Sequence, residues 1–82
     1  MAKNKHYVYI VKCNDNTLYT GYTVDLTRRI KEHNEGRGAK YTRGRLPVKL
    51  RYFEEYGVKS RAMKREYEIK QLTRPQKDEL IS

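Results

Sequence analysis

The stretch from Tyr7 to Gly21 constrains the fold most, because it predicts a β-hairpin on which the rest of a short chain must pack. Residues 6–13 are rich in Tyr, Val and Ile, which favour strands, and residues 18–24 have the same character. The Asn-Asp-Asn segment at 14–16 tolerates the left-handed backbone of a tight turn. Gly21 lies inside the second strand, where a glycine often marks a bulge or the close approach of another group.

Tyrosines recur along both predicted strands, at Tyr7, Tyr9, Tyr19 and Tyr22. Aromatic side chains in strands usually belong to a core. From the hairpin alone, a tyrosine-rich packing face is therefore the simpler interpretation.

Size and charge limit the class of protein. The 82 residues provide for one domain, 1–82, with one modest core. Cys13 is the single cysteine, which excludes a disulfide framework and a cysteine zinc cluster within one chain and suits a reducing compartment. Because no run has the length of a membrane span or the character of a signal peptide, we expect a cytoplasmic protein with no membrane association.

The net charge of +9, from 19 Lys+Arg against 10 Asp+Glu, favours a polyanionic partner, most often nucleic acid. Residues 36–51 carry six of these cations and no acid. This stretch includes a long loop, 37–47, in which basic side chains lie on both sides of one aromatic residue, Tyr41. Such a pattern suits phosphate contacts and base stacking, although a merely solvated basic loop explains it equally well. The residues proposed for nucleic-acid binding are Lys40, Tyr41, Arg43 and Arg45.

An aspartate cap and a glycine stop predict a short helix within residues 25–36. Its apolar residues are only Leu26 and Ile30. Arg29 and His33 occupy the remaining positions of the same stripe, one turn apart on one face. A cation and an imidazole thus stand where a core-facing helix normally has Leu or Val.

A third strand is predicted for Val48–Tyr56, followed by a helix over about 60–72 and a last short helix that begins at Thr73-Arg74-Pro75. The strand pattern assigns one side to Val48, Leu50, Tyr52 and Tyr56, with Glu54 as the exception. Ser60 is the expected cap of the long helix. Its apolar stripe comprises Ala62, Met63, Ile69 and Leu72, with Tyr67 beside it.

Glu66 lies inside that stripe, where a carboxylate is partly desolvated unless it has a partner or a metal. Each misplaced polar residue has a plain explanation: Arg29 extends to solvent, backbone groups satisfy His33, and Glu66 pairs with Lys70. Together they favour chemistry, because a carboxylate holds Mg²⁺, an arginine steadies a phosphoryl oxyanion, and a His or Tyr moves protons.

These motifs resemble the GIY-YIG endonuclease family, in particular its small stand-alone bacterial branch. Tyr7-Val8-Tyr9 stands where the family has Gly-Ile-Tyr, and Tyr19-Thr20-Gly21 where it has Tyr-Ile-Gly. The run from Tyr19 to Asn34 resembles its second strand and first helix. Segments 38–48 and 60–66 resemble this branch and the related nuclease domain of the eukaryotic structure-specific enzyme. The likeness covers nearly the whole chain.

The resemblance implies an α+β fold, a three-stranded antiparallel sheet flanked by helices. It implies an active site formed by Tyr9, Tyr19, Arg29, His33 and Glu66, with Glu66 as the metal ligand. Tyr7 replaces the motif glycine and Thr20 its isoleucine. A late asparagine of some members has no evident counterpart, since Asn34 is the last asparagine.

By this resemblance the expected function is hydrolysis of DNA phosphodiesters with Mg²⁺ or Mn²⁺, in DNA repair or recombination, on structured or branched DNA. Products would carry a 5′-phosphate and a 3′-hydroxyl. Tyr9 is the first candidate for general base, and its pKa of about 10 would need lowering by Arg29 and the metal. His33 and Tyr19 compete for that role.

Two other functions stay open. One is a non-catalytic nucleic-acid-binding module, and the other is a structural protein whose basic face docks an acidic protein. Because no attached targeting domain is visible, three alternatives stay open: the chain acts weakly alone, acts as a homodimer, or acts with a protein partner that supplies specificity.

Overall fold

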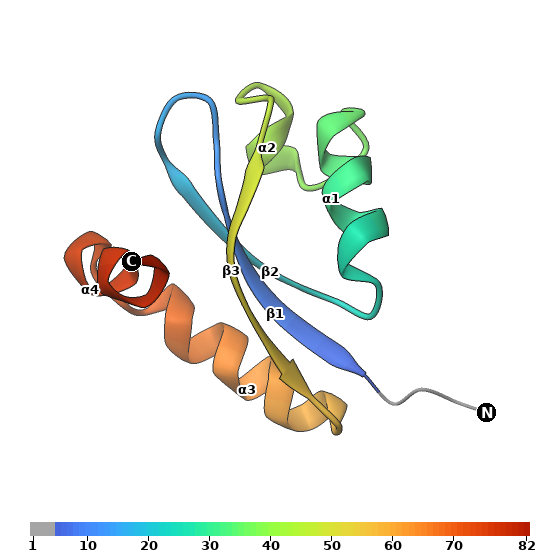
Figure 1. The fold of residues 1–82 in the computed structure, drawn as a ribbon, viewed down its shortest axis with the longest axis vertical. Helices are drawn as coiled ribbons and strands as arrows, with labels where there is room; N and C mark the ends of the chain where they lie inside the picture. The colour runs from blue at the N-terminus through green and yellow to red at the C-terminus, as the bar shows by residue number, and fades with distance from the viewer. Residues whose placement is uncertain (1–4) are drawn as a thin grey trace.

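The computed structural model describes residues 5–82, and a three-stranded antiparallel sheet separates two layers of helices (Figure 1). The α+β class predicted from the sequence is therefore confirmed. The strand order is β2-β1-β3, so the central strand is the first in the chain. The elements are β1 (His6–Lys12), β2 (Leu18–Thr23), α1 (Leu26–Asn34), α2 (Lys40–Arg43), β3 (Lys49–Tyr56), α3 (Lys59–Lys70) and α4 (Arg74–Ile81).

The turn between β1 and β2 forms as its residue types predict. Asn16 adopts the left-handed backbone conformation, with φ of 73°. The Asp15 carboxylate accepts a hydrogen bond of 2.6 Å from the Thr17 hydroxyl, and the Cys13 N–H donates to the Thr17 carbonyl at 2.8 Å. These local bonds set the β1–β2 register, in which Tyr9 lies opposite Gly21.

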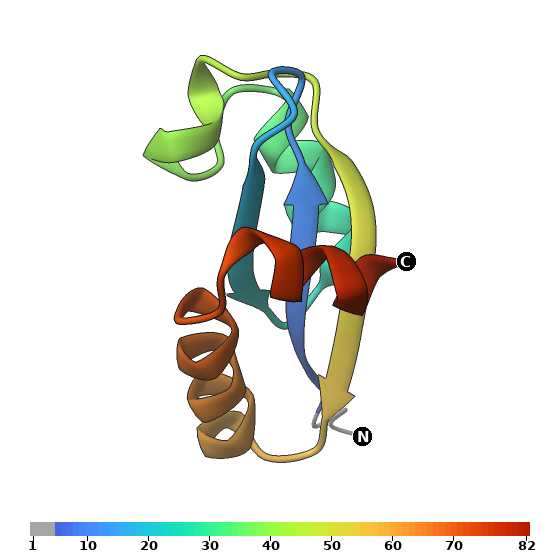
Figure 2. The ribbon, with the colours of Figure 1, turned by 90° about the vertical axis from the view of Figure 1, so that its left-hand side faces the viewer.

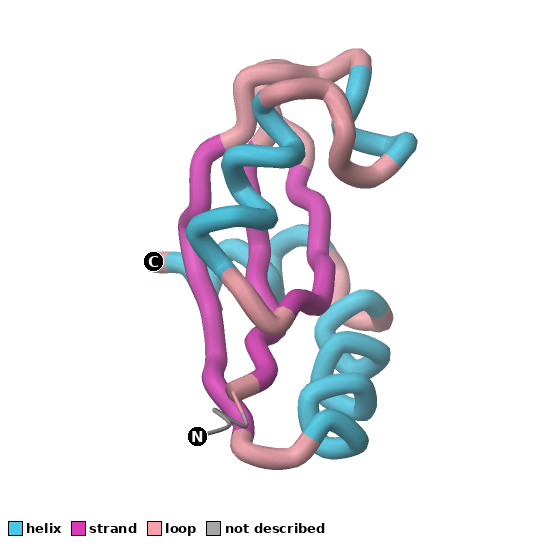
Figure 3. The backbone as a smooth tube through the Cα atoms, turned by 90° about the vertical axis from the view of Figure 1, so that its right-hand side faces the viewer, coloured by secondary structure: helices cyan, strands magenta, loops and turns pink. Residues whose placement is uncertain are grey.

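The central strand supplies side chains to both faces of the sheet, because successive strand residues point in opposite directions. On one face, Val8 and Ile10 of β1 pack with Ala62 and Ile69 of α3, and α4 side chains pack against this cluster. The other carries Tyr9, Val11, Cys13 and Val48, with Leu26 and Ile30 of α1 beside them. Figure 3 shows α1 crossing this second face, while α3 and α4 lie on the first. Each helix layer thus has its own small core.

A bulge in β3 makes the predicted face assignment of this strand wrong. Ile10 pairs with Tyr52 and Val11 with Leu50, so Arg51 has no opposite residue in β1. An extra residue reverses the side-chain alternation beyond it. Val48 therefore packs on the α1 face, whereas Tyr52 packs on the α3 face.

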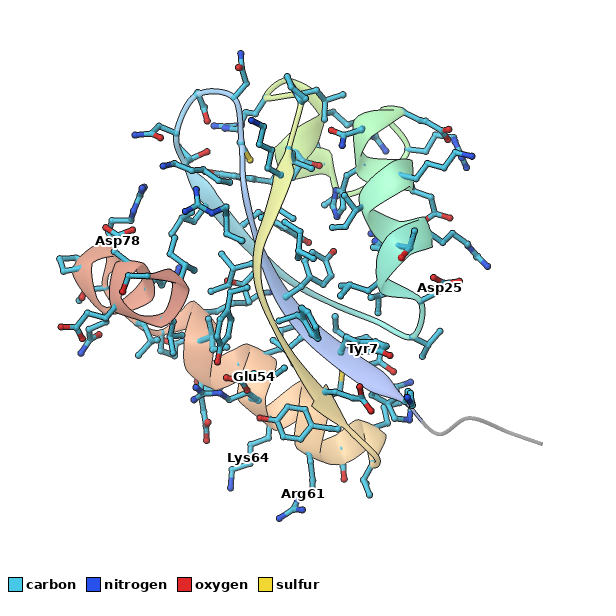
Figure 4. The ribbon with its side chains drawn as sticks, in the orientation of Figure 1. Tyr7, Asp25, Glu54, Arg61, Lys64 and Asp78 are labelled. Carbon is cyan, nitrogen blue, oxygen red and sulfur yellow. The ribbon has the colours of Figure 1, made fainter. Side chains whose placement is uncertain are left out.

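Glu54 is the polar exception predicted in β3, and the structure gives it partners. The Arg65 guanidinium of α3 donates to both carboxylate oxygens, at 2.9 and 3.1 Å, and the Tyr52 and Tyr56 hydroxyls donate to the same group. Figure 4 shows Glu54 between β3 and α3. This bidentate pair lowers the pKa of Glu54 despite partial burial and ties α3 to the sheet.

Helix α1 has the predicted caps. Asp25 accepts from the Arg28 N–H at 3.1 Å, and Gly36 follows the helix with φ of +79°. Helix α4 begins with a capping box formed by Thr73 and Gln76. The residues that define these helix ends therefore lie within a few positions of the ends themselves.

Three expectations about the other helices are wrong. Helix α3 begins after Val58 without a side-chain cap, so Ser60 lies in its first turn. Met63 and Tyr67 are 40% and 66% exposed and do not belong to a buried stripe. The basic loop contains the short helix α2. Within residues 5–82, every helix is too short or too polar to cross a membrane.

Candidate active site

A chain of hydrogen bonds links β1, α1 and α2 on the α1 face of the sheet. The Tyr9 hydroxyl lies 2.8 Å from His33 Nε2, and His33 Nδ1 lies 2.9 Å from Thr42 Oγ1. Thr42 in turn donates to the Ala39 carbonyl at 2.9 Å. All three side chains are less than 2% exposed.

This chain assigns the proton positions on neutral His33. Thr42 has one hydroxyl hydrogen and gives it to Ala39, so Thr42 Oγ1 accepts the His33 Nδ1–H. His33 Nε2 is then an acceptor, and the Tyr9 hydroxyl donates to it. The arrangement can move a proton from the phenol to the imidazole.

Burial keeps both ends of this pair neutral. It raises the pKa of Tyr9 to about 12, against the opposite influence of the nearby Arg29 guanidinium. Burial, and then the Arg29 charge, lower the pKa of His33 below its usual value. The lowered Tyr9 pKa that the sequence-based mechanism required is therefore not produced by the protein groups around it. Neutral His33 is the acceptor that the structure provides.

Arg29 is half-buried beside the Tyr9 hydroxyl, in the position that the helix stripe predicts. Glu32 holds its guanidinium through an ion pair of 3.1 Å, and Arg28 pairs with the same carboxylate at 3.2 Å. Arg28 and Arg29 also line an open cavity of about 290 Å³. A charged guanidinium thus faces both the phenol and a space that solvent reaches.

Tyr19 joins the same cluster through its ring. Its centroid lies 5.6 Å from that of His33, 6.5 Å from Tyr9 and 5.9 Å from Tyr41, on which it stacks. Tyr41 also has the Arg45 guanidinium 4.1 Å from its ring centre. Tyr41 therefore forms a wall of the site, and its ring is not the unoccupied stacking platform that the sequence suggested.

The four residues predicted to bind nucleic acid differ in whether their side chains already have partners within the protein. Arg45 pairs with Asp15 at 3.0 Å and donates to the Tyr41 carbonyl at 3.0 Å, so it has a structural task. Lys40 and Arg43 lie on α2 with exposed side chains. Nucleic-acid binding by these residues stays a prediction, and Lys40 and Arg43 are the more available pair.

Glu66 approaches from the other layer of helices. It lies on α3, its side chain is 15% exposed, and its carboxylate is 3.2 Å from Lys70 Nζ. The pairing with Lys70 is thus observed. Glu66 is nevertheless near enough to Tyr9 for its charge to contribute to the raised pKa of the phenol. Four of the five predicted site residues therefore lie together on the α1 face, and Glu66 acts on Tyr9 through its charge from α3.

Gly21 explains how the Tyr9 ring fits against β2. A Cβ at this position would lie 2.6 Å from Tyr9 Cζ, and closer still to the hydroxyl. The Tyr9 ring therefore lies over the β2 backbone at the position where a side chain is missing, on the α1 face of the sheet. The strand glycine predicted to allow close approach does so here.

The Gly21→Ala variant is expected to lose most activity, because Tyr9 must move away from His33 to accommodate the methyl group. Overpacking of a buried site costs roughly 1–3 kcal/mol of stability. Gly44→Ala is the matched control, since a Cβ there meets no atom within 4 Å. Cleavage rates and thermal melting of both variants test this, and a Gly21→Ala protein with wild-type activity would contradict the close contact.

Sequence reasoning missed three residues that organise the site. Thr42 fixes the tautomer of His33, and Glu32 positions Arg29. Gly38 leaves room for His33, because a Cβ there would lie 2.7 Å from the imidazole Cγ. The spacing Gly36-x-Gly38 after the helix was the available signal for the last of these. Asn34 binds the backbone N–H and carbonyl of Val48, at 2.7 and 3.1 Å, and so has a structural role.

Comparison with known proteins identifies the class. The model of the GIY-YIG catalytic domain matches residues 5–79, so the chain belongs to the GIY-YIG family. The GIY-YIG domain is a nuclease domain.

More particularly, the chain resembles proteins designated UPF0213. It is 61% identical over 76 residues to one from Halobacterium salinarum, a match that covers 93% of this chain and 99% of the relative. It is 60% identical over 78 residues to one from Staphylococcus epidermidis, covering 95% of each. The solution structure of a UPF0213 protein from Bacillus halodurans is similar with a TM-score of 0.62 and 52% identity, over 94% of this chain and 82% of that one. A structure from E. faecalis gives a TM-score of 0.64 and 44% identity, over the same shares.

GIY-YIG nucleases typically use divalent metal ions, and within residues 5–82 no three His, Cys, Asp or Glu side chains group together as ligands for one. Mg²⁺ binds in nuclease-type sites through one or two carboxylates and takes its other ligands from water and phosphate. Glu66 offers one partly desolvated carboxylate, and its present counter-charge is a side chain on a flexible stem, Lys70. Glu66 is the residue that would hold the ion.

Proposed function

We propose that this protein is a metal-dependent DNA endonuclease that hydrolyses phosphodiester bonds. The observation that carries the proposal is convergence: Tyr9, Tyr19, Arg29 and His33 gather on one face of the sheet, and Glu66 of α3 is near enough for its charge to act on Tyr9. Membership of a nuclease family supports it. The net charge of +9 suits a polyanionic substrate.

In the proposed reaction, the Tyr9 oxygen takes a proton from the attacking water while its own proton passes to His33 Nε2. Their separation of 2.8 Å supports this double transfer. The resulting hydroxide forms a bond to phosphorus, and the bond from phosphorus to the 3′-oxygen breaks. The 3′-oxygen takes a proton from solvent, which leaves a 5′-phosphate and a 3′-hydroxyl. Thr42 Oγ1 stabilises the positive charge on protonated His33, because it accepts the hydrogen bond from the His33 Nδ1–H.

Arg29 acts on the phosphoryl group. Its guanidinium adjoins Tyr9 and opens on a cavity, so it can bind a non-bridging oxygen and offset the negative charge that grows in the transition state. A Mg²⁺ or Mn²⁺ ion held by Glu66 would supply Lewis-acid stabilisation of the same charge. Lys40 and Arg43 on α2 would contact backbone phosphates without reading bases.

The direct test is incubation of the purified protein with supercoiled, linear, nicked and branched DNA, with Mg²⁺, with Mn²⁺ or with EDTA. We expect nicking or strand cleavage that EDTA abolishes. Salt-sensitive binding without products would instead support a non-catalytic binding module. If the protein neither binds nor cleaves DNA, the remaining function is that of a structural protein whose basic face docks an acidic protein. Four expectations from the sequence stay predictions: a role in repair or recombination, a preference for branched DNA, a cytoplasmic location, and a dimer or protein partner.

A further inference from the structure

A cavity beside the candidate site has lining residues from four elements. Its volume is about 250 Å³, and the residues that line it are Leu18, Tyr19 and Thr20 of β2, Tyr41 of α2, Lys70 of α3 and Lys77 of α4. Figure 2 shows α2 and α3 along the β2 side of the sheet, with α4 crossing its near face. We name this space the β2-edge cavity.

The two sides of the β2-edge cavity differ in chemistry. Tyr19 and Tyr41 stack at 5.9 Å and, with Leu18, form an apolar wall. Lys70 and Lys77, on separate helices, line the same cavity, and each side chain carries one ammonium group. Within the described residues, the buried Thr20 hydroxyl has no hydrogen-bond partner. An apolar wall that faces two cations suits a ligand with an apolar body and an anionic end.

Lys70 connects this cavity to the candidate active site. Its ammonium group lies 3.2 Å from the Glu66 carboxylate, and its side chain is 48% exposed. A ligand phosphate on Lys70 is therefore one side chain away from Glu66, and Tyr19 contacts both the cavity and the His33 ring.

We propose, on the basis of the function proposed above, that the β2-edge cavity holds the sugar–phosphate unit next to the scissile phosphate. Lys70 and Lys77 bind its phosphate, and the deoxyribose packs against Tyr19 and Tyr41. The base does not enter, because Arg45 and Tyr19 already occupy positions on the Tyr41 ring. The site therefore recognises the DNA backbone and is indifferent to sequence.

The first test measures DNA affinity against salt concentration in EDTA, which separates binding from cleavage. The Lys70→Gln/Lys77→Gln variant is expected to reduce the steepness of log K against log[salt] by about one, because the two lysines share a single phosphate. Arg61→Gln/Lys64→Gln is the matched control, because it removes two charges of α3 that point away from the sheet (Figure 4). The Lys70→Arg/Lys77→Arg variant, which keeps both charges, should retain the steepness.

The second test uses deoxyribose 5-phosphate as the probe in an NMR titration of the isotope-labelled protein. Amide shifts should concentrate at Thr20, Tyr41 and Lys77 and disappear in the double glutamine variant. Inorganic phosphate alone should bind more weakly, because it lacks the sugar. Equal salt dependence of the glutamine variant and the wild type, or shifts scattered over the surface, would overturn the subsite. If the subsite fails these tests but the wild type cleaves DNA in the same preparation, the proposed endonuclease function still holds. If the wild type neither binds nor cleaves DNA, the proposed function fails as well.

Discussion

Replacing Glu66 with glutamine is expected to abolish phosphodiester cleavage while fold and DNA binding remain. The amide keeps the size of the side chain but loses the negative charge that would hold a divalent cation. Metal stabilisation of phosphoryl transfer amounts to several kcal/mol, so the rate should fall by roughly a thousandfold or more. Cleavage with Mg²⁺ and binding in EDTA should be measured on the same preparation.

The control for Glu66→Gln is Glu68→Gln, two residues further along α3. Glu68 is 46% exposed and makes a surface ion pair of 3.4 Å with Arg65, so its loss should leave activity unchanged. Glu66→Gln also frees Lys70 from its counter-charge, and DNA binding in EDTA should therefore be equal or tighter. Metal-dependent cleavage by Glu66→Gln at the wild-type rate would remove Glu66 from the mechanism.

The parts of this fold that sequence could predict are those with local causes. The first hairpin follows from strand-forming residues on either side of a turn segment, and α1 from Asp25 and Gly36 at its ends. Arg29 and His33 were found because they interrupt a stripe with a fixed helical period. Each of these signals lies within about one turn of the residue that it places.

The remaining features depend on contacts between distant residues. The bulge at Arg51 is a property of the β1–β3 pairing, and no feature of β3 alone predicts it. Thr42 lies in a segment without periodicity, and it becomes significant only because α2 packs its hydroxyl against His33, nine residues earlier. The raised pKa of Tyr9 likewise comes from tertiary burial, which residue identity alone does not show.

Tyr9→Phe should reduce the cleavage rate by about 10²- to 10⁴-fold, the range typical of a lost proton-transfer group. The ring stays, so the buried cluster should keep its packing, but His33 Nε2 loses its buried hydrogen-bond partner and the melting temperature should fall modestly. The pH profile separates the two assignments of the base. If His33 accepts the proton, the rate needs only neutral His33, whose pKa lies below 6.5, and it should be level from pH 7 to 9. If phenolate were required outright, the rate would rise about tenfold per pH unit toward the Tyr9 pKa of about 12.

Thr42 makes this assignment testable without altering a reacting group. Thr42→Val removes the acceptor of the His33 Nδ1–H, so the imidazole can carry its proton on Nε2 instead. In that tautomer Nε2 donates a hydrogen bond to the Tyr9 oxygen and cannot accept the Tyr9 proton. The rate should fall while DNA affinity is unchanged, and Thr42→Ser, which restores a hydroxyl, should recover it. Wild-type cleavage by Thr42→Val, or a log-linear rise of the wild-type rate between pH 7 and 9, would transfer the role of base from the His33–Tyr9 pair to Tyr9 alone.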